Sequence, residues 1–228
     1  AYEHSGFDDA IILVLDGAGS SYTFGKENCS VYYRESIDSG YEPLYKSVVG
    51  DGTPITAVAP NFVNKKTNIG AGYVYTAVTE WIGFDSLDSG KTMGLAVYGK
   101  EDSRIPQLLS IEHQGNKSCT LRPDTFNNSS SYYTKIGNIG ICGATINDEY
   151  INNLDRTNEY NKAKLAYRVQ KDYEYYLIHT CKKVLSMSKS KNLILTGGCA
   201  LNCVANYKLL KSLPVDVNLY VDPTCDDS

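Results

Sequence analysis

Hydrophobic and polar positions along this chain predict a mixture of strands and helices. A continuous apolar run from Ala10 to Leu15 has the length of a strand covered on both faces. Apolar residues at three- and four-residue steps predict a helix over 71–82, ended by Gly83, and a long helix, or two in series, over about 158–186. Strand-like and helix-like segments therefore occur in the same chain.

The last part of the chain follows the order strand, helix, strand. Leu193–Leu195 and Val215–Val221 have the composition of buried strands, and residues 199–211 between them form a helical pattern. This order predicts a parallel α/β layer, because the helix returns the chain so that the second strand runs in the same direction as the first.

The rest of the chain has weaker patterns. Ser21–Phe24 and Ser30–Arg34 alternate enough to predict a β-meander after the first strand. Between residues 100 and 150 the periodicity fades, and Asn127–Ser131 is typical of an exposed loop.

Composition narrows the classes of protein. The 228 residues can form one large or two small domains, and a formal net charge of −4 gives no general attraction to nucleic acid or to an anionic membrane. Seven cysteines without a tight framework favour a reduced, intracellular protein. No apolar run approaches the roughly 20 residues that cross a bilayer. We therefore expect a soluble, cytoplasmic protein, and the start at Ala1 hints at an absent upstream piece.

Gly197 and Gly198 lie between an apolar run and a helical pattern. Glycines at such a junction let a ligand approach the backbone, and the unpaired amides of a helix start favour an anion such as phosphate. The same spacing also fits a tight turn without any ligand.

The amino-acid sequences of two distant segments are more specific than this pair of glycines. Gly90–Gly99 is Gly-Lys-Thr-Met-Gly-Leu-Ala-Val-Tyr-Gly, and Thr196–Asn206 is Thr-Gly-Gly-Cys-Ala-Leu-Asn-Cys-Val-Ala-Asn. With these motifs, and with the order of shorter ones from Ser5–Gly17 to Asp222–Asp227, the chain resembles the O-carbamoyltransferases that modify antibiotics and nodulation factors. The resemblance covers nearly the whole chain except roughly residues 100–155.

This resemblance implies an α/β domain of the actin-like ATPase (ribonuclease H-like) superfold, related to the enzymes that put threonylcarbamoyl on transfer RNA. Residues 1–228 would then form most of one actin-like carbamoyl-transfer domain that is incomplete at both ends. Upstream strands carrying a histidine pair and a downstream carbamoyl-activating domain would be absent.

The resemblance also implies an activity. In that family a separate domain makes carbamoyl adenylate from carbamoyl phosphate and ATP, and the actin-like domain transfers the carbamoyl group to a hydroxyl of a small molecule or nucleoside. This fragment alone is expected to be inactive, and a homodimer is an open alternative for its assembly. The residues expected to contact the nucleotide are Gly17, Gly19, Gly90, Lys91, Gly94, Gly197, Gly198 and Asn202. For Lys91 the other interpretation is an ordinary solvated lysine.

Two aspartates are the expected catalytic and metal-binding residues. Asp16 ends a buried strand, where a carboxylate needs a cation or hydrogen-bond donors, and Asp226 follows the last strand. The resemblance implies that Asp16 and Asp226 hold a divalent metal, iron or magnesium, together with two histidines of a His-x-x-x-His motif just upstream of Ala1. His4, His113 and His179 are interpreted as ordinary histidines.

Cys199 and Cys203 are four residues apart and are interpreted as a small apolar helix face rather than a zinc site. Two other functions remain open. One is a kinase of the same superfold, and the other is a non-catalytic nucleotide-binding fragment.

Overall fold

The structure, a computed structural model, describes residues 1–17, 19–22, 25–50, 62–65, 70–109, 126–128, 144–146 and 148–225. The chain divides into two compact units. Unit 1 comprises Ala1–Lys66 and Leu177–Ser228, and unit 2 comprises Thr67–Tyr176. The boundary between the units falls inside helix α6 (Glu159–Leu185).

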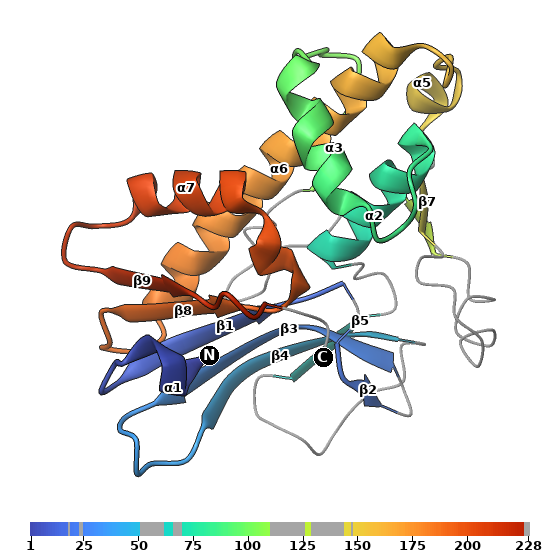
Figure 1. Ribbon diagram of the computed structural model, residues 1–228. Coiled ribbons are helices and arrows are strands. Elements are labelled where there is room, and N and C mark those ends of the chain that lie inside the picture. Colours follow the sequence, from blue (N-terminus) through green and yellow to red (C-terminus); the bar gives the residue numbers. More distant parts are fainter. Residues whose placement is uncertain are drawn as a thin grey trace. The chain divides into compact units, whose positions relative to one another are not determined.

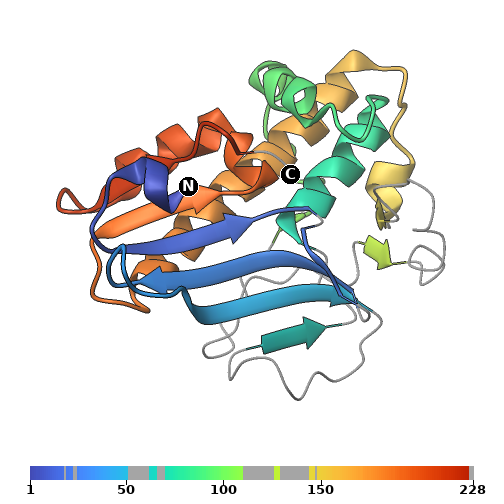
Figure 2. The ribbon, with the colours of Figure 1, turned by 60° about the horizontal axis from the view of Figure 1, so that its bottom comes forward.

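Unit 1 contains a mixed sheet in the order β5-β4-β3-β1-β8-β9, with β2 paired to β3 (Figures 1 and 2). Its strands in the described part of the chain are β1 (Ala10–Leu15), β2 (Ser21–Tyr22), β3 (Gly25–Arg34), β4 (Glu42–Gly50), β5 (Phe62–Lys65), β8 (Asn192–Thr196) and β9 (Asn218–Val221). β1 pairs antiparallel with β3 and parallel with β8, and β9 continues the parallel half. The mixed α/β class is confirmed, and the actin-like superfold stays a prediction.

β1 lies between β3 and β8 and has the bounds that its apolar run predicts. On one face of β1, Ile11, Leu13 and Leu15 are at most 2% exposed, and on the other face Ala10 and Ile12 are at most 5% exposed. Because both faces of a central strand are covered, its sequence is apolar throughout rather than alternating. The predicted strands at Ala10–Leu15 and Leu193–Leu195 are confirmed.

On one side of β1 a meander forms, as predicted, from β2, β3 and β4. Phe24, at the end of the predicted first meander strand, lies outside the described residues. Arg34 at the end of β3 is held between two tyrosine rings, with its guanidinium carbon 4.4 Å from the Tyr2 ring centre and 4.5 Å from that of Tyr41. Tyr2 belongs to the short helix α1 (Tyr2–Ser5), so this stack fixes α1 to the sheet.

On the other side, β8 leads through the 3-10 helix η2 (Gly198–Leu201) and helix α7 (Cys203–Ser212) to β9. The parallel β8–β9 pair confirms the predicted strand-helix-strand layer. The prediction that a buried strand starts at Val215 is wrong, because Val215 is fully exposed in a turn and pairing starts with the bond from Asn218 N to Lys191 O. β9 is only partly buried because it is the outer strand of the sheet.

Unit 2 is mainly helical in its described part. It contains α2 (Ala71–Ile82), α3 (Ser89–Leu95), the 3-10 helix η1 (Ala96–Tyr98), α5 (Glu149–Asn152), the first part of α6, and the short strands β6 (Phe126–Asn128) and β7 (Ala144–Ile146). The predicted helix over 71–82 and its end at Gly83 are confirmed. Gly83 has a φ of 99°, and its N–H and that of Phe84 donate to the last turn of α2. Asn127 and Asn128 belong to β6, so the predicted loop is wrong at these two positions, and Ser129–Ser131 lie outside the described residues.

The core of unit 2 joins α2 to α6. Val74 and Val78 on α2 and Leu165 and Val169 on α6 are fully buried. The hydroxyl of Tyr75 donates to Gln170 Oε1 at 2.7 Å. The long helix predicted over 158–186 is confirmed as α6.

The segment after η1 is anchored to α6 by polar contacts. A Cβ at Gly99 would lie 2.7 Å from the carbonyl carbon of Ala163, so this backbone approaches the helix closely. Asp102 accepts hydrogen bonds from Arg104 Nη2 at 2.7 Å and from Lys164 Nζ at 3.0 Å. Arg104, and then Lys164, hold the pKa of Asp102 far below its usual range.

Candidate functional site at the carboxyl edge of the sheet

Three turns follow the parallel strands of unit 1. Asp16 and Gly17 follow β1, Gly197 and Gly198 follow β8, and Asp222 follows β9. The register pairs Val14 with Thr196 and Leu195 with Val221, so the three strands end at the same edge. In open α/β sheets this edge is where ligands bind. The structure therefore brings Asp16 and the Gly197–Gly198 turn, predicted from distant parts of the sequence, to neighbouring strand ends.

Asp16 is half-buried and is held from two sides. Its backbone N–H donates to the carbonyl oxygen of Asn28 on β3 at 3.0 Å, and its carboxylate Oδ1 accepts from the N–H of Gly17 at 2.6 Å. Gly19, further along the same turn, donates its N–H to the carbonyl oxygen of Glu27 at 2.7 Å. The predicted site residues Gly17 and Gly19 thus belong to the backbone turn that fixes the Asp16 carboxylate.

In the turn after β8, the packing of the fold requires one of the two glycines. Gly197 is buried with a φ of 90°, and a Cβ there would lie 2.9 Å from the carbonyl carbon of Leu15 and closer still to its oxygen. Close packing on β1 therefore requires glycine at this position without any ligand. Gly198 is half-buried and begins η2, so it is the more accessible of the two.

Asn202 does not lie within a continuous helix, and the predicted helix over 199–211 is wrong in this respect. The backbone leaves helical geometry at Asn202, which is the N-cap of α7, and its Oδ1 accepts from the N–H of Ala205 at 3.0 Å. Asn206 donates its Nδ2 to the carbonyl oxygen of Ala200 at 2.6 Å, which ties α7 to η2. The side-chain oxygen of Asn202 thus caps a helix.

The same break separates the two cysteines. Cys199 is half-buried in η2, whereas Cys203 is exposed at the start of α7. The prediction that they form one apolar face of a single helix is wrong, because an N-cap residue lies between them.

Asp222 is a carboxylate at this edge that sequence reasoning missed. It follows β9 directly, is 4% exposed, and accepts from the N–H and hydroxyl of Thr224 at 3.0 and 2.8 Å. Its N–H donates to the carbonyl oxygen of Leu195 at 3.2 Å, which ties the turn to β8. The signal was its place immediately after the strand. Asp226, the predicted second ligand, lies outside the described residues.

The described residues contain no group of three histidine, cysteine, aspartate or glutamate side chains able to hold a metal ion. His4 Nδ1 lies 3.9 Å from Asp222 Oδ1 and its side chain is 60% exposed, while His179 is half-buried in α6. His113 lies outside the described residues. The side chains placed by the structure therefore do not assemble a metal site among themselves.

In unit 2, Gly90, Lys91 and Gly94 lie on α3, whose buried Thr92 donates its hydroxyl to that of Thr79 on α2 at 2.8 Å. A Cβ at Gly90 or at Gly94 would meet no atom within 4 Å. These two glycines are thus not required by packing against any described residue. The side chain of Lys91 is 61% exposed, and its Nζ lies 2.7 Å from Asp88 Oδ2.

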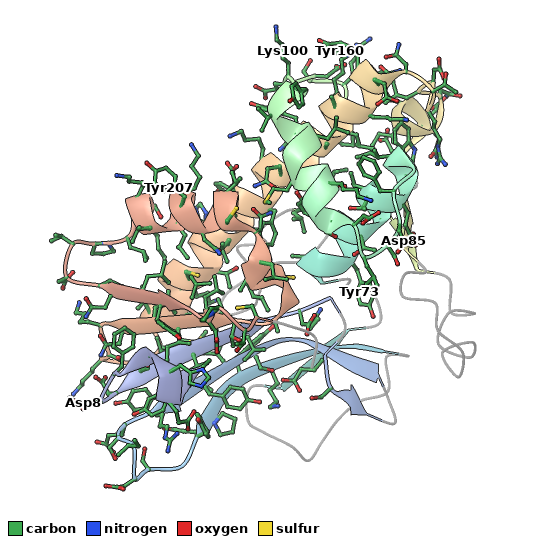
Figure 3. The ribbon with its side chains drawn as sticks, viewed as in Figure 1. Asp8, Tyr73, Asp85, Lys100, Tyr160 and Tyr207 are labelled. Atoms are coloured by element: carbon green, nitrogen blue, oxygen red, sulfur yellow. The ribbon has the colours of Figure 1, made fainter. Side chains whose placement is uncertain are left out.

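Exposed apolar side chains occur on α7. Tyr207, which is 57% exposed, projects from α7 away from β8 and β9 (Figure 3).

Among the helices of the described part of the chain, none is both long enough and apolar enough to cross a bilayer.

Comparisons with known proteins identify the family of this chain. The model of the family described as "Carbamoyltransferase N-terminus" matches residues 1–228. The nodulation protein NolNO of Sinorhizobium fredii is 23% identical over 231 residues, which cover 100% of this chain and 28% of that protein. The nodulation protein NolO of Bradyrhizobium diazoefficiens is 24% identical over 228 residues, covering 100% of this chain and 34% of that protein.

An uncharacterized protein of Synechocystis, sll1178, is 27% identical over 236 residues, covering 100% of this chain and 32% of that protein. The chain spans about a third of the length of these curated relatives. Because the family model matches residues 1–228, this chain belongs to the carbamoyltransferase N-terminal domain family.

Proposed function

We propose that this chain is the transfer domain of an ATP-dependent O-carbamoyltransferase. The carbamoyl group would pass from carbamoyl adenylate, made from carbamoyl phosphate and ATP, to a hydroxyl of a small-molecule or nucleoside acceptor. The observation that carries the proposal is the placement of Asp16 and the Gly197–Gly198 turn at adjacent ends of β1 and β8, in a chain of this family.

In this proposal the carboxyl edge of unit 1 holds the reacting end of carbamoyl adenylate. The accessible backbone at Gly198 offers an amide to the phosphate, and the turn through Gly17 and Gly19 keeps the Asp16 carboxylate beside it. The acceptor oxygen bonds to the carbamoyl carbon and releases its proton to water, the bond from that carbon to the phosphate oxygen breaks, and AMP leaves with the electron pair of that bond. Holding both reactants in this geometry is the contribution of the sheet edge.

A divalent cation, when bound, would supply charge stabilisation for this step. Asp16 is a carboxylate suited to such an ion, and Asp226 is the second expected one. Because the described residues do not form a three-ligand cluster, the proposal assigns no step of the reaction to the metal.

The glycines of α3 support a ligand role for unit 2. Glycine in an exposed helix costs about 1 kcal/mol relative to alanine. Gly90 and Gly94 both lie in this seven-residue helix, and packing requires neither of them. A ligand that approaches the helix backbone would account for both, so we propose, for unit 2 taken by itself, that Gly90, Lys91 and Gly94 contact a nucleotide.

Lys91 provides a test of this assignment. If Lys91 donates to a phosphate, Lys91→Ala should weaken binding of AMP and ATP by about tenfold or more, because hydrogen bonds to charged groups contribute about 1.5–3 kcal/mol. Isothermal titration calorimetry measures the affinity. Asp88→Asn is the matched control, because it removes the same exposed ion pair and leaves the lysine. Equal weakening in both variants would show that only the ion pair matters.

The activity itself is tested with the complete gene product. Incubation with ATP, carbamoyl phosphate and a panel of sugars, nucleosides and other hydroxyl compounds should give a product whose mass has increased by one carbamoyl group. A phosphorylated acceptor would instead show a kinase of the same superfold. Nucleotide binding without any modified acceptor across the panel would support a non-catalytic nucleotide-binding protein.

A further inference from the structure

Asn28 lies directly across the sheet from Asp16. The β1–β3 register pairs Val14 with Ser30 and Leu15 with Cys29, and the bond from Asp16 N to Asn28 O extends it by one pair. Directly opposed residues of an antiparallel pair place their Cβ atoms on the same face of the sheet. The Asn28 side chain therefore starts on the same face as the Asp16 carboxylate.

The Asn28 side chain is buried, and its oxygen lacks a hydrogen bond from any described residue. The residue is 5% exposed, and its Oδ1 is shielded from water and has no hydrogen-bond partner among the described residues. A buried carbonyl without a donor is destabilising, and native proteins rarely keep one without a reason. Asn206 Oδ1 is likewise buried without a described partner, but the Nδ2 of Asn206 donates to the carbonyl oxygen of Ala200 and so links two elements.

The backbone at Asn28 is irregular on the side that pairs with β4. The β3–β4 pairing shifts between Glu27 and Cys29, which makes Asn28 the extra residue of a β-bulge. The bulge is fixed by Lys46 on β4, whose Nζ lies 3.1 Å from both carboxylate oxygens of Glu27, and by the hydroxyl of Ser30, which also donates to Glu27. Bulges are common next to active sites, where they re-aim one side chain.

We propose that Asn28 is a specificity residue whose Oδ1 accepts a hydrogen bond from the NH₂ group of the carbamoyl group. This inference rests on the proposed function. The NH₂ group is what distinguishes a carbamoyl from an acetyl group of the same shape, and a phosphoryl group has no N–H at all. The torsion that turns the Asn28 amide is soft, so Oδ1 can rotate toward a donor held beside Asp16. A carbamoyl group supplies the donor that this buried acceptor lacks among the described residues, whereas an acetyl group in the same place leaves it unpaired.

The test uses two stable analogues of the acyl adenylates that keep a phosphate-like linker and differ only in this group, 5′-O-(N-carbamoylsulfamoyl)adenosine (the carbamate) and 5′-O-(N-acetylsulfamoyl)adenosine (the acetate), with AMP as the reference ligand. The complete wild-type gene product should bind the carbamate about tenfold or more tightly than the acetate in titration calorimetry. Asn28→Leu should remove this preference by weakening carbamate binding, with affinities for the acetate and AMP unchanged. An unchanged preference in Asn28→Leu would overturn the inference and leave the proposed function intact.

Failure of the proposed function gives a different result, because then AMP does not bind and no acceptor is carbamoylated, and the inference falls with it. Thermal unfolding separates a binding role from a structural one. Asn28→Leu should unfold at the wild-type temperature or above, since Oδ1 has no described hydrogen bond to lose. A marked decrease would show that Asn28 holds the fold and would contradict the proposal. Asn206→Leu is the matched control, which should unfold at a lower temperature and keep the preference for carbamate.

Discussion

Replacing Asp16 by asparagine should reduce carbamoyl transfer on the order of a thousandfold while leaving unit 1 folded. The amide oxygen of asparagine can still accept the N–H of Gly17, and the backbone bond to Asn28 does not involve the side chain. What is lost is the negative charge that would hold a divalent cation at the strand end, and charge stabilisation beside the reacting group is worth about this factor. The measurement is kcat/KM for transfer by the complete gene product, alongside its affinity for AMP and its unfolding temperature.

The same strand supplies a control for Asp16→Asn. Asp8 lies exposed just before the amino end of β1, away from the carboxyl edge (Figure 3). Asp8→Asn removes an equal charge and should leave transfer unchanged. Transfer by Asp16→Asn at the wild-type rate would remove Asp16 from the site. A loss of AMP affinity equal to the loss of transfer would instead assign Asp16 to nucleotide binding rather than to the reacting group.

The elements that the sequence predicts well are those with strong periodic patterns and clear ends. β1 has its predicted bounds because it is central and apolar on both faces, and α2 stops at Gly83 because glycine accepts a positive φ there. The apolar residues around Val215 predict a strand there, but the chain turns at this position and the strand starts later. The sequence pattern does not show that pairing with β8 begins only at Asn218.

The break before α7 had a signal that was not used. Asn202 precedes a helical pattern, and asparagine is a preferred N-cap because its side chain accepts a backbone N–H three residues on. The prediction of one helix over 199–211 assumed that the helical periodicity continues through Asn202. For this reason the predicted environment of Cys203 is wrong: the residue is exposed rather than packed on the sheet.

The candidate site was predicted in part because motifs at strand ends reach the same edge once the strands are parallel. The resemblance to O-carbamoyltransferases predicted Asp16 and Gly198 at one site, and the structure places them at the ends of the paired strands β1 and β8. Asn28 could not, because its position opposite Asp16 depends on the β1–β3 register and on a bulge set by contacts with β4. Such cross-strand neighbours are determined by pairing geometry and leave no spacing in the sequence.

The glycines show a similar limit. In the sequence, Gly197 and Gly94 are equally plausible ligand contacts. In the structure, packing on Leu15 explains Gly197, whereas a side chain at Gly94 would meet open space. The fold already accounts for Gly197, whereas the open space at Gly94 leaves room for a ligand to approach the backbone.

Gly197→Ala should therefore act through the fold, and its effect should be large. The φ of 90° is strained for alanine at a cost of about 1–3 kcal/mol. The added Cβ would also press on the backbone of Leu15, which overpacks the centre of the sheet at a further cost of about 1–3 kcal/mol. Because the turn must move away from β1, we expect a markedly lower unfolding temperature, and loss of AMP binding even where the protein remains folded.

Two glycines of unit 1 separate the causes. Gly6 has a φ of 70° with open space around it, so Gly6→Ala isolates the backbone strain, and Gly40→Ala, with neither constraint, should be neutral. Thermal unfolding of the three variants should rank Gly197→Ala far below Gly6→Ala, with Gly40→Ala at the wild-type value. If Gly197→Ala unfolds like Gly6→Ala but no longer binds AMP, the glycine is needed for the ligand rather than for packing on Leu15. The contact between the ends of β1 and β8 would then be looser than the structure places it.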